Sequence, residues 1–254
     1  MKDKLKLYGG ILLAVLIVLI ILMALLGRKA GNSSSEIVYI PKKDKTKDWV
    51  YTADYKKEVD AASFVRDGQE YRAVDIKAPY INIDTQSAIS SNDNIKFRFN
   101  DAIFEYNRGV NGADTYLKKF DYDYYVNGTV LSVVITSLNG VNNIIYPHYY
   151  TYNYNLEKGS LLTFEDVYTS LGFTSDSLEE RVSEEISEII NDKMANIPND
   201  SPELRKNNSV VAYKNSIKEN NTKFFLSENG TLNVIVGLDI PIGRGTFENI
   251  LTIN

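Results

Sequence analysis

The sequence lacks cysteine altogether and contains little histidine, tryptophan or proline. Its 254 residues include no Cys, one His, one Trp and six Pro. The absence of cysteine excludes structural disulfides, cysteine-ligated zinc, iron–sulfur clusters, thiol catalysis and a lipid-modified cysteine anchor. If the domain is exported, packing alone must stabilise it, and the lack of disulfides favours a bacterial protein over a eukaryotic secreted one.

The single histidine also limits the chemistry. A Ser/His/Asp triad or a histidine metal site would have to include His148, and no recognisable partner motif accompanies it. Asp121 and Asp123 share one face of an expected strand; they could bind calcium or share a proton, or simply be solvated. Gly243-Arg244-Gly245 lacks the Lys-Ser/Thr of a phosphate loop and reads as a turn or bulge. We predict no catalytic residue, no metal site and no cofactor.

A long apolar run near the start is the strongest signal. Ile11 to Leu26 is unbroken, and with its tolerant flanks the segment has 20 residues, about 30 Å as a helix, which is the thickness of a bilayer core. We expect an uncleaved transmembrane helix at 11–27; a cleaved signal peptide is the alternative. Three lysines precede the span and two basic residues follow it, so the bias favours the N-terminus inside.

The expected layout is therefore a cytoplasmic tail at 1–10, the span at 11–27, a linker at 28–48 and an extracytoplasmic α+β domain at 49–254. The first ten residues carry a net charge of +2 and the span carries none. Since the whole chain carries −5, the part beyond the span carries −7. This excess disfavours nucleic acid and anionic wall polymers as partners and favours a cationic one.

Hydrophobic periodicity predicts the first half of the domain. Trp49 to Tyr55 suggests a short strand, and 71–83 reads as an extended stretch in which Pro79 favours an edge or irregular segment. An apolar stripe with helical spacing then predicts an amphipathic helix, with Asn92 or Asp93 as N-cap and Gly109 or Gly112 at its end. The stripe consists of Ile95, Phe99, Ala102, Ile103, Tyr106 and Val110.

Two Asn-Gly dipeptides predict β-hairpins with type I′ turns. The first hairpin joins 120–126 to 129–138, and the second joins 224–228 to 231–240. Between them, aromatic residues alternate along 146–156 and predict a strand with a Tyr-rich face, which turns at 157–160.

Helical patterns fill the remaining part of the chain. A short helix is expected to begin at 163–166, where acidic residues lie near its positive end. A longer one covers 177–195 with an acidic outer side, 196–208 reads as a loop, and a shorter helix spans 210–218. A strand at 247–253 closes the domain. The expected fold class is α+β, an antiparallel sheet with amphipathic helices on one side, preceded by one transmembrane helix.

Three segments carry a resemblance to a known family. They are Pro79-Tyr80-Ile81 ahead of the amphipathic helix, residues 146–163 (YPHYYTYNYNLEKGSLLT) and residues 225–230 (FLSENG). Together they resemble the extracytoplasmic domain of lysozyme-sensing anti-sigma-V factors, which is shared by some bacterial peptidoglycan deacetylases, over about Tyr71 to Asn254. The resemblance implies a cell-surface binding domain that, in the sensor, binds lysozyme. The sigma-binding and deacetylase activities are not expected to carry over.

These observations favour a binding or sensor module facing the wall of a bacterial cell, anchored in its membrane by a single span. The expected ligand is a cationic protein such as lysozyme, or a wall glycan. The predicted contact residues are Tyr146, His148, Tyr150, Tyr152 and Tyr154, since tyrosine supplies rigid amphipathic contact area; the alternative is that these rings pack under the helices. A wall-active hydrolase using His148 and a structural scaffold of a membrane complex are the other hypotheses.

Overall fold

The computed structural model describes residues 44, 46–141, 144–194, 201–240 and 247–254, which all belong to one compact unit. In this part of the chain the fold is α+β with four α-helices and antiparallel strand pairs, as predicted. The elements are β1 (Val50–Thr52), β2 (Ser63–Arg66), β3 (Gln69–Arg72), η1 (Ala73–Asp75), β4 (Pro79–Ile81), α2 (Gln86–Val110), β5 (Thr115–Asn127), β6 (Val130–Val141), β7 (Ile144–Asn155), β8 (Ser160–Leu161), α3 (Phe164–Ser170), α4 (Ser175–Met194), α5 (Pro202–Lys218), β9 (Lys223–Leu226), β10 (Leu232–Leu238) and β11 (Phe247–Ile253).

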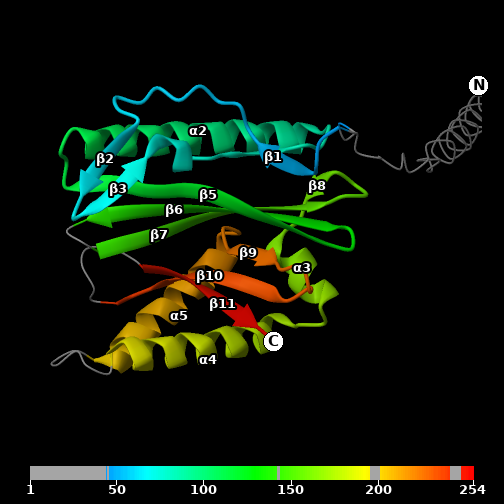
Figure 1. Cartoon of the computed structure of the whole chain (residues 1–254). Coiled ribbons are helices and arrows are strands. Elements are labelled where there is room, and N and C mark those ends of the chain that lie inside the picture. Colours follow the sequence, from blue (N-terminus) through cyan, green and yellow to red (C-terminus); the bar gives the residue numbers. More distant parts are fainter. Residues whose placement is uncertain (1–43, 45, 142–143, 195–200, 241–246) are drawn as a thin grey trace, which may run out of the picture. The chain divides into compact units, whose positions relative to one another are not determined.

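The layering corrects the prediction of one sheet with helices on one side. A sheet of order β5-β6-β7-β8 faces a second sheet of order β11-β10-β9, while α2 covers the outer face of the first and α4 and α5 cover the second (Figure 1). The pairs β1-β4 and β2-β3 form two smaller sheets. Because β6 is covered on both faces, Leu131 to Ile135 is buried continuously and does not alternate with exposed residues.

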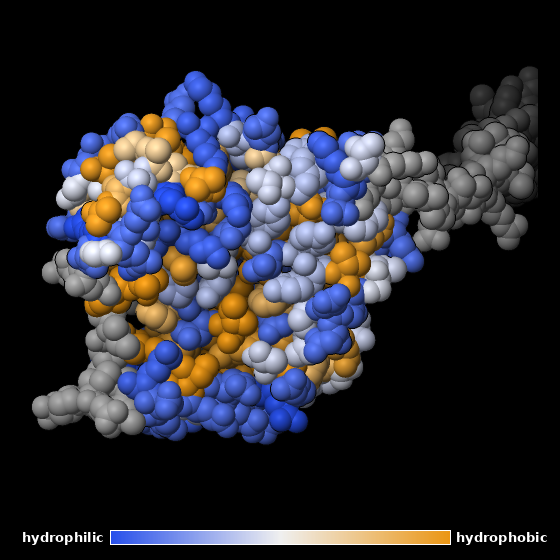
Figure 2. Space-filling view, in the orientation of Figure 1, coloured by the Kyte–Doolittle hydropathy of each residue, from blue (hydrophilic) through white to orange (hydrophobic). Residues whose placement is uncertain are grey.

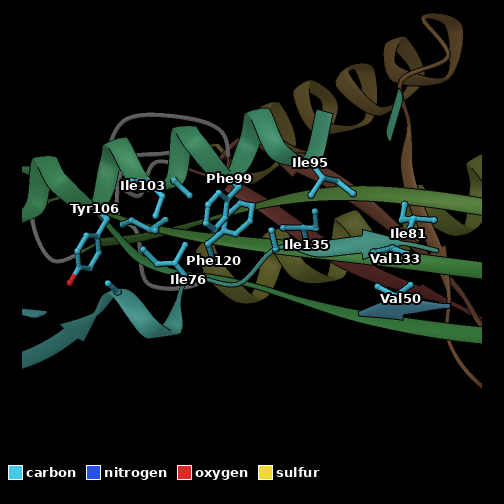
Figure 3. Packing of buried hydrophobic residues seen from close by; sticks show 14 of the residues in the cluster. Val50, Ile76, Ile81, Ile95, Phe99, Ile103, Tyr106, Phe120, Val133 and Ile135 are labelled. Carbon is cyan, nitrogen blue, oxygen red and sulfur yellow. The ribbon is translucent and has the colours of Figure 1, made fainter. Parts of the chain in front are cut away.

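The first core lies between α2 and the first sheet, where the predicted helical stripe packs (Figure 3). Phe99 from α2 and Phe120 from β5 meet edge to face, with ring centroids 6.4 Å apart. Ile95 and Ile135 are both fully buried in the same cluster. The one tryptophan, Trp49, is partly buried against this core, so its fluorescence reports on the packing of this layer.

Helix α2 begins earlier than predicted, because Thr85 is the N-cap and its side chain accepts the Ala88 N–H. Asn92, one of the predicted caps, lies inside the helix and is 6% exposed. Its amide accepts the Ile81 N–H at 2.8 Å and donates to the Ile81 carbonyl at 3.0 Å. The Asn92 side chain thus forms the two hydrogen bonds with β4 that a neighbouring strand would form. The helical pattern in the sequence gives no sign of this role.

The two glycines predicted to end α2 have different roles. Gly112 follows the helix with a φ of +83°, in the left-handed region that glycine tolerates. Gly109 lies inside the helix and is buried. A Cβ there would lie 2.7 Å from Phe64 and from Tyr116, so glycine permits the two aromatic side chains to approach the helix backbone.

Both predicted hairpins are present, but neither turn has Asn-Gly at its two central positions. In the first, Asn127 pairs with Val130 and only Gly128 has a positive φ, which fits a two-residue turn with glycine first. In the second, the Gly230 N–H donates to the Ser227 carbonyl at 2.9 Å and Gly230 has a φ of +83°. This is a longer loop with a glycine bulge.

The second core lies between the second sheet and the remaining helices. Helix α3 begins at the predicted place with a capping box, and the Thr163 hydrogen bonds lower the pKa of Asp166. Along α4 the residues Leu178, Val182, Ile186 and Ile190 are fully buried; the predicted last residue, Ala195, lies outside the described part of the chain. The prediction of a loop at 202–208 is wrong, because the cap Ser201 and Pro202 in the first turn start α5 there.

A small polar network joins the two sheets. The Asn153 amide accepts the Ser132 hydroxyl at 2.7 Å and donates to the Phe224 carbonyl at 2.8 Å. The Ser132 hydroxyl also accepts the Leu226 N–H at 3.0 Å. Both side chains are buried, and they satisfy backbone groups on the edge of β9 that β10 does not reach. Beside them, Val134, Phe225 and Ile235 form a third, apolar cluster.

The predicted transmembrane helix at 11–27 lies outside the described residues. Among those that are described, no helix is long and apolar enough to cross a bilayer. The end of the predicted linker contacts the domain, because the Asn82 amide donates to the carbonyls of Asp48 at 3.0 Å and Asp44 at 3.4 Å.

Candidate ligand-binding surface

The predicted Tyr-rich face of β7 turns toward α2. The Tyr154 hydroxyl donates to Ser91 Oγ at 2.7 Å, and the Tyr152 hydroxyl donates to Asn94 Oδ1 at 2.7 Å. Tyr154 is fully buried, and this burial raises its pKa to about 12. Burial also raises the pKa of the half-buried Tyr152. The ring of Tyr154 therefore packs as the alternative interpretation expected, while Tyr152 keeps part of its surface exposed.

The other predicted contact residues lie farther along the same strand. Tyr146 is 6% exposed, and its ring centroid lies 6.2 Å from that of Phe247 in β11. His148 is half-buried and pairs across the strands with Ser137 of β6. Tyr150 is also half-buried. Of the five predicted residues, His148, Tyr150 and Tyr152 thus offer surface to a ligand, and their role in binding stays a prediction.

Tyr150 lies at the centre of a charged cluster along the outer edge of β7. The Arg98 guanidinium of α2 and the Lys223 ammonium of β9 lie 5.0 and 5.7 Å from its ring centroid. Glu248 of β11 accepts from Lys223 at 2.6 Å and from the Tyr149 N–H at 2.8 Å. Burial raises the pKa of Tyr150, while the Arg98 charge acts in the opposite direction. The cluster joins three layers of the domain.

The sequence predicted only part of this cluster at the edge of β7. The alternation of aromatics in 146–156 pointed to Tyr150, but Arg98, Lys223 and Glu248 come from three other elements. No local spacing relates them to the strand, because the pairing of β9 and β11 with β10 and the stacking of the sheets place them there. Glu248 also covers a backbone donor on a strand edge, which limits pairing with foreign strands.

Helix α4 carries a row of carboxylates on its outer side, about 24 Å long. Every fourth residue along it is acidic and exposed, and we name these five the acidic row: Asp176, Glu180, Glu184, Glu188 and Asp192. Figure 2 shows hydrophilic residues along the lower rim, where Figure 1 places α4. Like charges four residues apart repel each other by a few tenths of a kcal/mol per pair. Two members of the row also have favourable surroundings, because Arg181 lies 4.0 Å from Glu184 and Asp176 lies in the first turn, where the helix dipole favours an acid.

Two of the open grooves elsewhere on the surface have aromatic side chains in their lining. One, of about 560 Å³, separates α2 from the segment 54–58 and is lined by Tyr55, Lys96 and Phe104 among others. The other, of about 570 Å³, lies beside the second hairpin and is lined by Tyr125, Asn229 and further polar residues. An aromatic ring with amide and hydroxyl groups around it is suited to a sugar, so the second groove is the candidate surface for a wall glycan.

The residues considered for catalysis or metal binding are not gathered into a site. Asp121 is half-buried and lies 3.2 Å from Lys119, while Asp123 is exposed. Across the described ranges there is no group of three His, Cys, Asp or Glu side chains placed to hold a metal ion. The segment Gly243-Arg244-Gly245 lies outside those ranges.

Comparisons with known proteins add no assignment. The chain matches none of the protein-family models, and no curated protein is similar to it in sequence.

Proposed function

We propose that this chain is a membrane-anchored extracytoplasmic binding or sensor module facing the bacterial cell wall, and that its ligand is a cationic protein such as lysozyme. The observation that carries the proposal is the acidic row on α4, together with the net charge of −5. The row lies opposite the buried side of α4 and its neighbouring carboxylates repel one another, so the packing of the domain does not account for it. A cationic partner would turn this repulsion into attraction.

The motif resemblance supports the same ligand. The residues Pro79-Tyr80-Ile81, the 146–163 segment and 225–230 resemble the domain with which lysozyme-sensing anti-sigma-V factors bind lysozyme. In this structure the three segments are β4, the strand β7 with the turn that follows it, and the end of β9 with its loop. All three are parts of the framework of the domain, so the resemblance supports the fold of a receptor domain but does not identify contact residues.

The membrane placement can be tested directly. A C-terminal reporter on the full chain in intact bacterial cells is expected to be digested by added protease, because the span at 11–27 would leave 49–254 outside. A reporter fused at the N-terminus is the matched control and should stay protected until the cells are lysed. Protection of the C-terminal reporter would contradict the proposed extracytoplasmic location.

Ligand binding is tested with lysozyme as the probe and the full chain immobilised. The parent is expected to retain lysozyme at low salt and to release it as salt rises, since exposed charges are screened. Neutralising the acidic row (Asp176→Asn, Glu180→Gln, Glu184→Gln, Glu188→Gln, Asp192→Asn) should weaken binding about tenfold and flatten the salt dependence. Neutralisation should also leave α4 folded, because the buried side of the helix is unchanged.

A control variant removes the same number of charges from exposed carboxylates elsewhere: Asp114→Asn, Asp123→Asn, Glu157→Gln, Glu165→Gln and Glu228→Gln. It should retain most of the affinity. Equal losses in the two variants would show a response to net charge alone and would remove α4 as the contact face. Retention of soluble wall fragments but not of lysozyme would move the ligand to a glycan and the search to the groove at Tyr125.

A further inference from the structure

The outer face of α2 carries large exposed apolar side chains among charged residues. Phe97 is 57% exposed and Phe104 is 63% exposed, although both lie on the helix that covers the first core. Ile89 on the same helix is 48% exposed. Hydrophobic residues appear among hydrophilic ones over this layer in Figure 2. Single exposed apolar residues are ordinary, but two phenylalanines two turns apart on one helix face form a patch.

The order of charged and aromatic residues along this face is acid, ring, ring, base, so an antiparallel second copy would set rings against rings and acid against base. Asp93 lies four residues before Phe97, and Arg108 lies four residues after Phe104. All four are exposed and occupy the side of α2 opposite to its buried stripe. Glu105 contacts the Arg108 guanidinium at 3.0 Å, which holds that charge at the end of the face.

We infer that two copies of this chain associate through α2, antiparallel, about a two-fold axis that passes between Asn100 and Asp101. In that register Phe97 of each copy meets Phe104 of its partner, and Asp93 meets Arg108. Each contact forms twice, as a symmetric dimer interface requires. We therefore assign a second copy of the chain to the face that carries Phe97 and Phe104, which we name the apolar face. An antiparallel copy presents the same rings and charges in the opposite order, so the two faces match. A parallel pairing in register would place like charges together.

The absence of cysteine allows a crosslinking test on the full chain without background. Asn100→Cys, next to the proposed axis, should give a dimer with a short bis-maleimide in native membranes. Ser90→Cys on the same helix should not, because antiparallel pairing separates the two Ser90 positions by about 30 Å. Thr129→Cys, in the first hairpin turn and away from α2, measures the amount of crosslinked dimer that chance collisions produce. An Asn100→Cys product at that level, or a strong Ser90→Cys product, would overturn the proposal.

Charge reversal tests the register within the Asn100→Cys background. Asp93→Arg or Arg108→Asp alone should reduce the crosslinked dimer about tenfold, because each converts two attractions into two repulsions. The double variant should return to nearly the parent level, and a variant that merely misfolds would not be rescued in this way. A double variant no better than the singles would refute the pairing of Asp93 with Arg108.

Discussion

Replacing Asn153 by leucine is expected to lower the free energy of unfolding by about 3 kcal/mol. The side chain is 4% exposed and bonds both Ser132 and the Phe224 carbonyl. Leucine has the same branching at Cγ but leaves the serine hydroxyl and the carbonyl without these partners between two sheets. Urea unfolding of the full chain in mild detergent measures the loss, and Trp49 fluorescence and far-UV circular dichroism should change together if the two layers unfold together.

The matched control is the same substitution two residues along the strand. Asn155 is half-buried, and its side chain accepts the N–H groups of Glu157 and Lys158 in an exposed turn. Water can replace those bonds, so Asn155→Leu should cost less than about 1 kcal/mol. Adding Ser132→Ala to Asn153→Leu should cost less than the sum of the two changes, because the two side chains share one network. Strict additivity would contradict the network.

The hydrogen bonds between this network and the edge of β9 are one example of an arrangement that recurs in this fold. Polar side chains occupy places where another strand would otherwise supply hydrogen bonds. The Asn92 side chain hydrogen-bonds the N–H and carbonyl of Ile81 in β4, and the Asn82 side chain donates to the carbonyl of Asp48, just before β1. Glu248 serves the N–H of Tyr149 on the edge of β7. Short strands with covered edges resist pairing with foreign strands, which benefits a domain that has no disulfide bond to restrain it.

The local patterns in the sequence predicted much of this fold because their causes are local. The helical stripe around Phe99, the alternation along β7 and the capping signal at Thr163 each depend on residues within a few positions of one another. These predictions agree with α2, β7 and α3. The closing strand at 247–253 was predicted with both of its ends. Local signals also located both hairpins, although the turn geometry differs.

The features that were missed depend on contacts distant in sequence. Asn92 was interpreted as a cap because polar residues before a helical stripe usually are, whereas its partner Ile81 lies in a separate strand. The stacking of two sheets was missed because burial of β6 on both faces gives no period. For the candidate surface, Tyr150 was predicted, but Arg98 and Glu248 reach it only through the layering. A single sequence contains no signal that relates such positions.

The acidic row and the apolar face lie on helices that cover opposite outer faces of the domain. The acidic row belongs to α4, next to the second sheet, and the apolar face belongs to α2, next to the first. Two sheets lie between the two helices (Figure 1). A dimer through α2 would therefore leave both acidic rows open to ligand, so the two proposed surfaces are compatible and can be disrupted independently.

Replacing Phe99 by alanine is expected to lower the free energy of unfolding by about 4 kcal/mol. Its ring is 1% exposed and packs against Phe120 in the first core, so alanine leaves a cavity between α2 and the sheet. Trp49 is partly buried against the same core, and its fluorescence should follow the transition to lower urea concentrations. The loss exceeds that expected for any surface substitution because both transfer energy and packing are lost.

Phe97→Ala, two residues earlier on the same helix, is the matched control for this core prediction. Its ring is 57% exposed on the outer face, so the variant should unfold within about 0.5 kcal/mol of the parent at protein concentrations too low for association. In the crosslinking assay the ranking should reverse, with Phe97→Ala losing dimer while it keeps the fold. If Phe97→Ala were as destabilising as Phe99→Ala at low concentration, the assignment of inner and outer faces of α2 would be wrong.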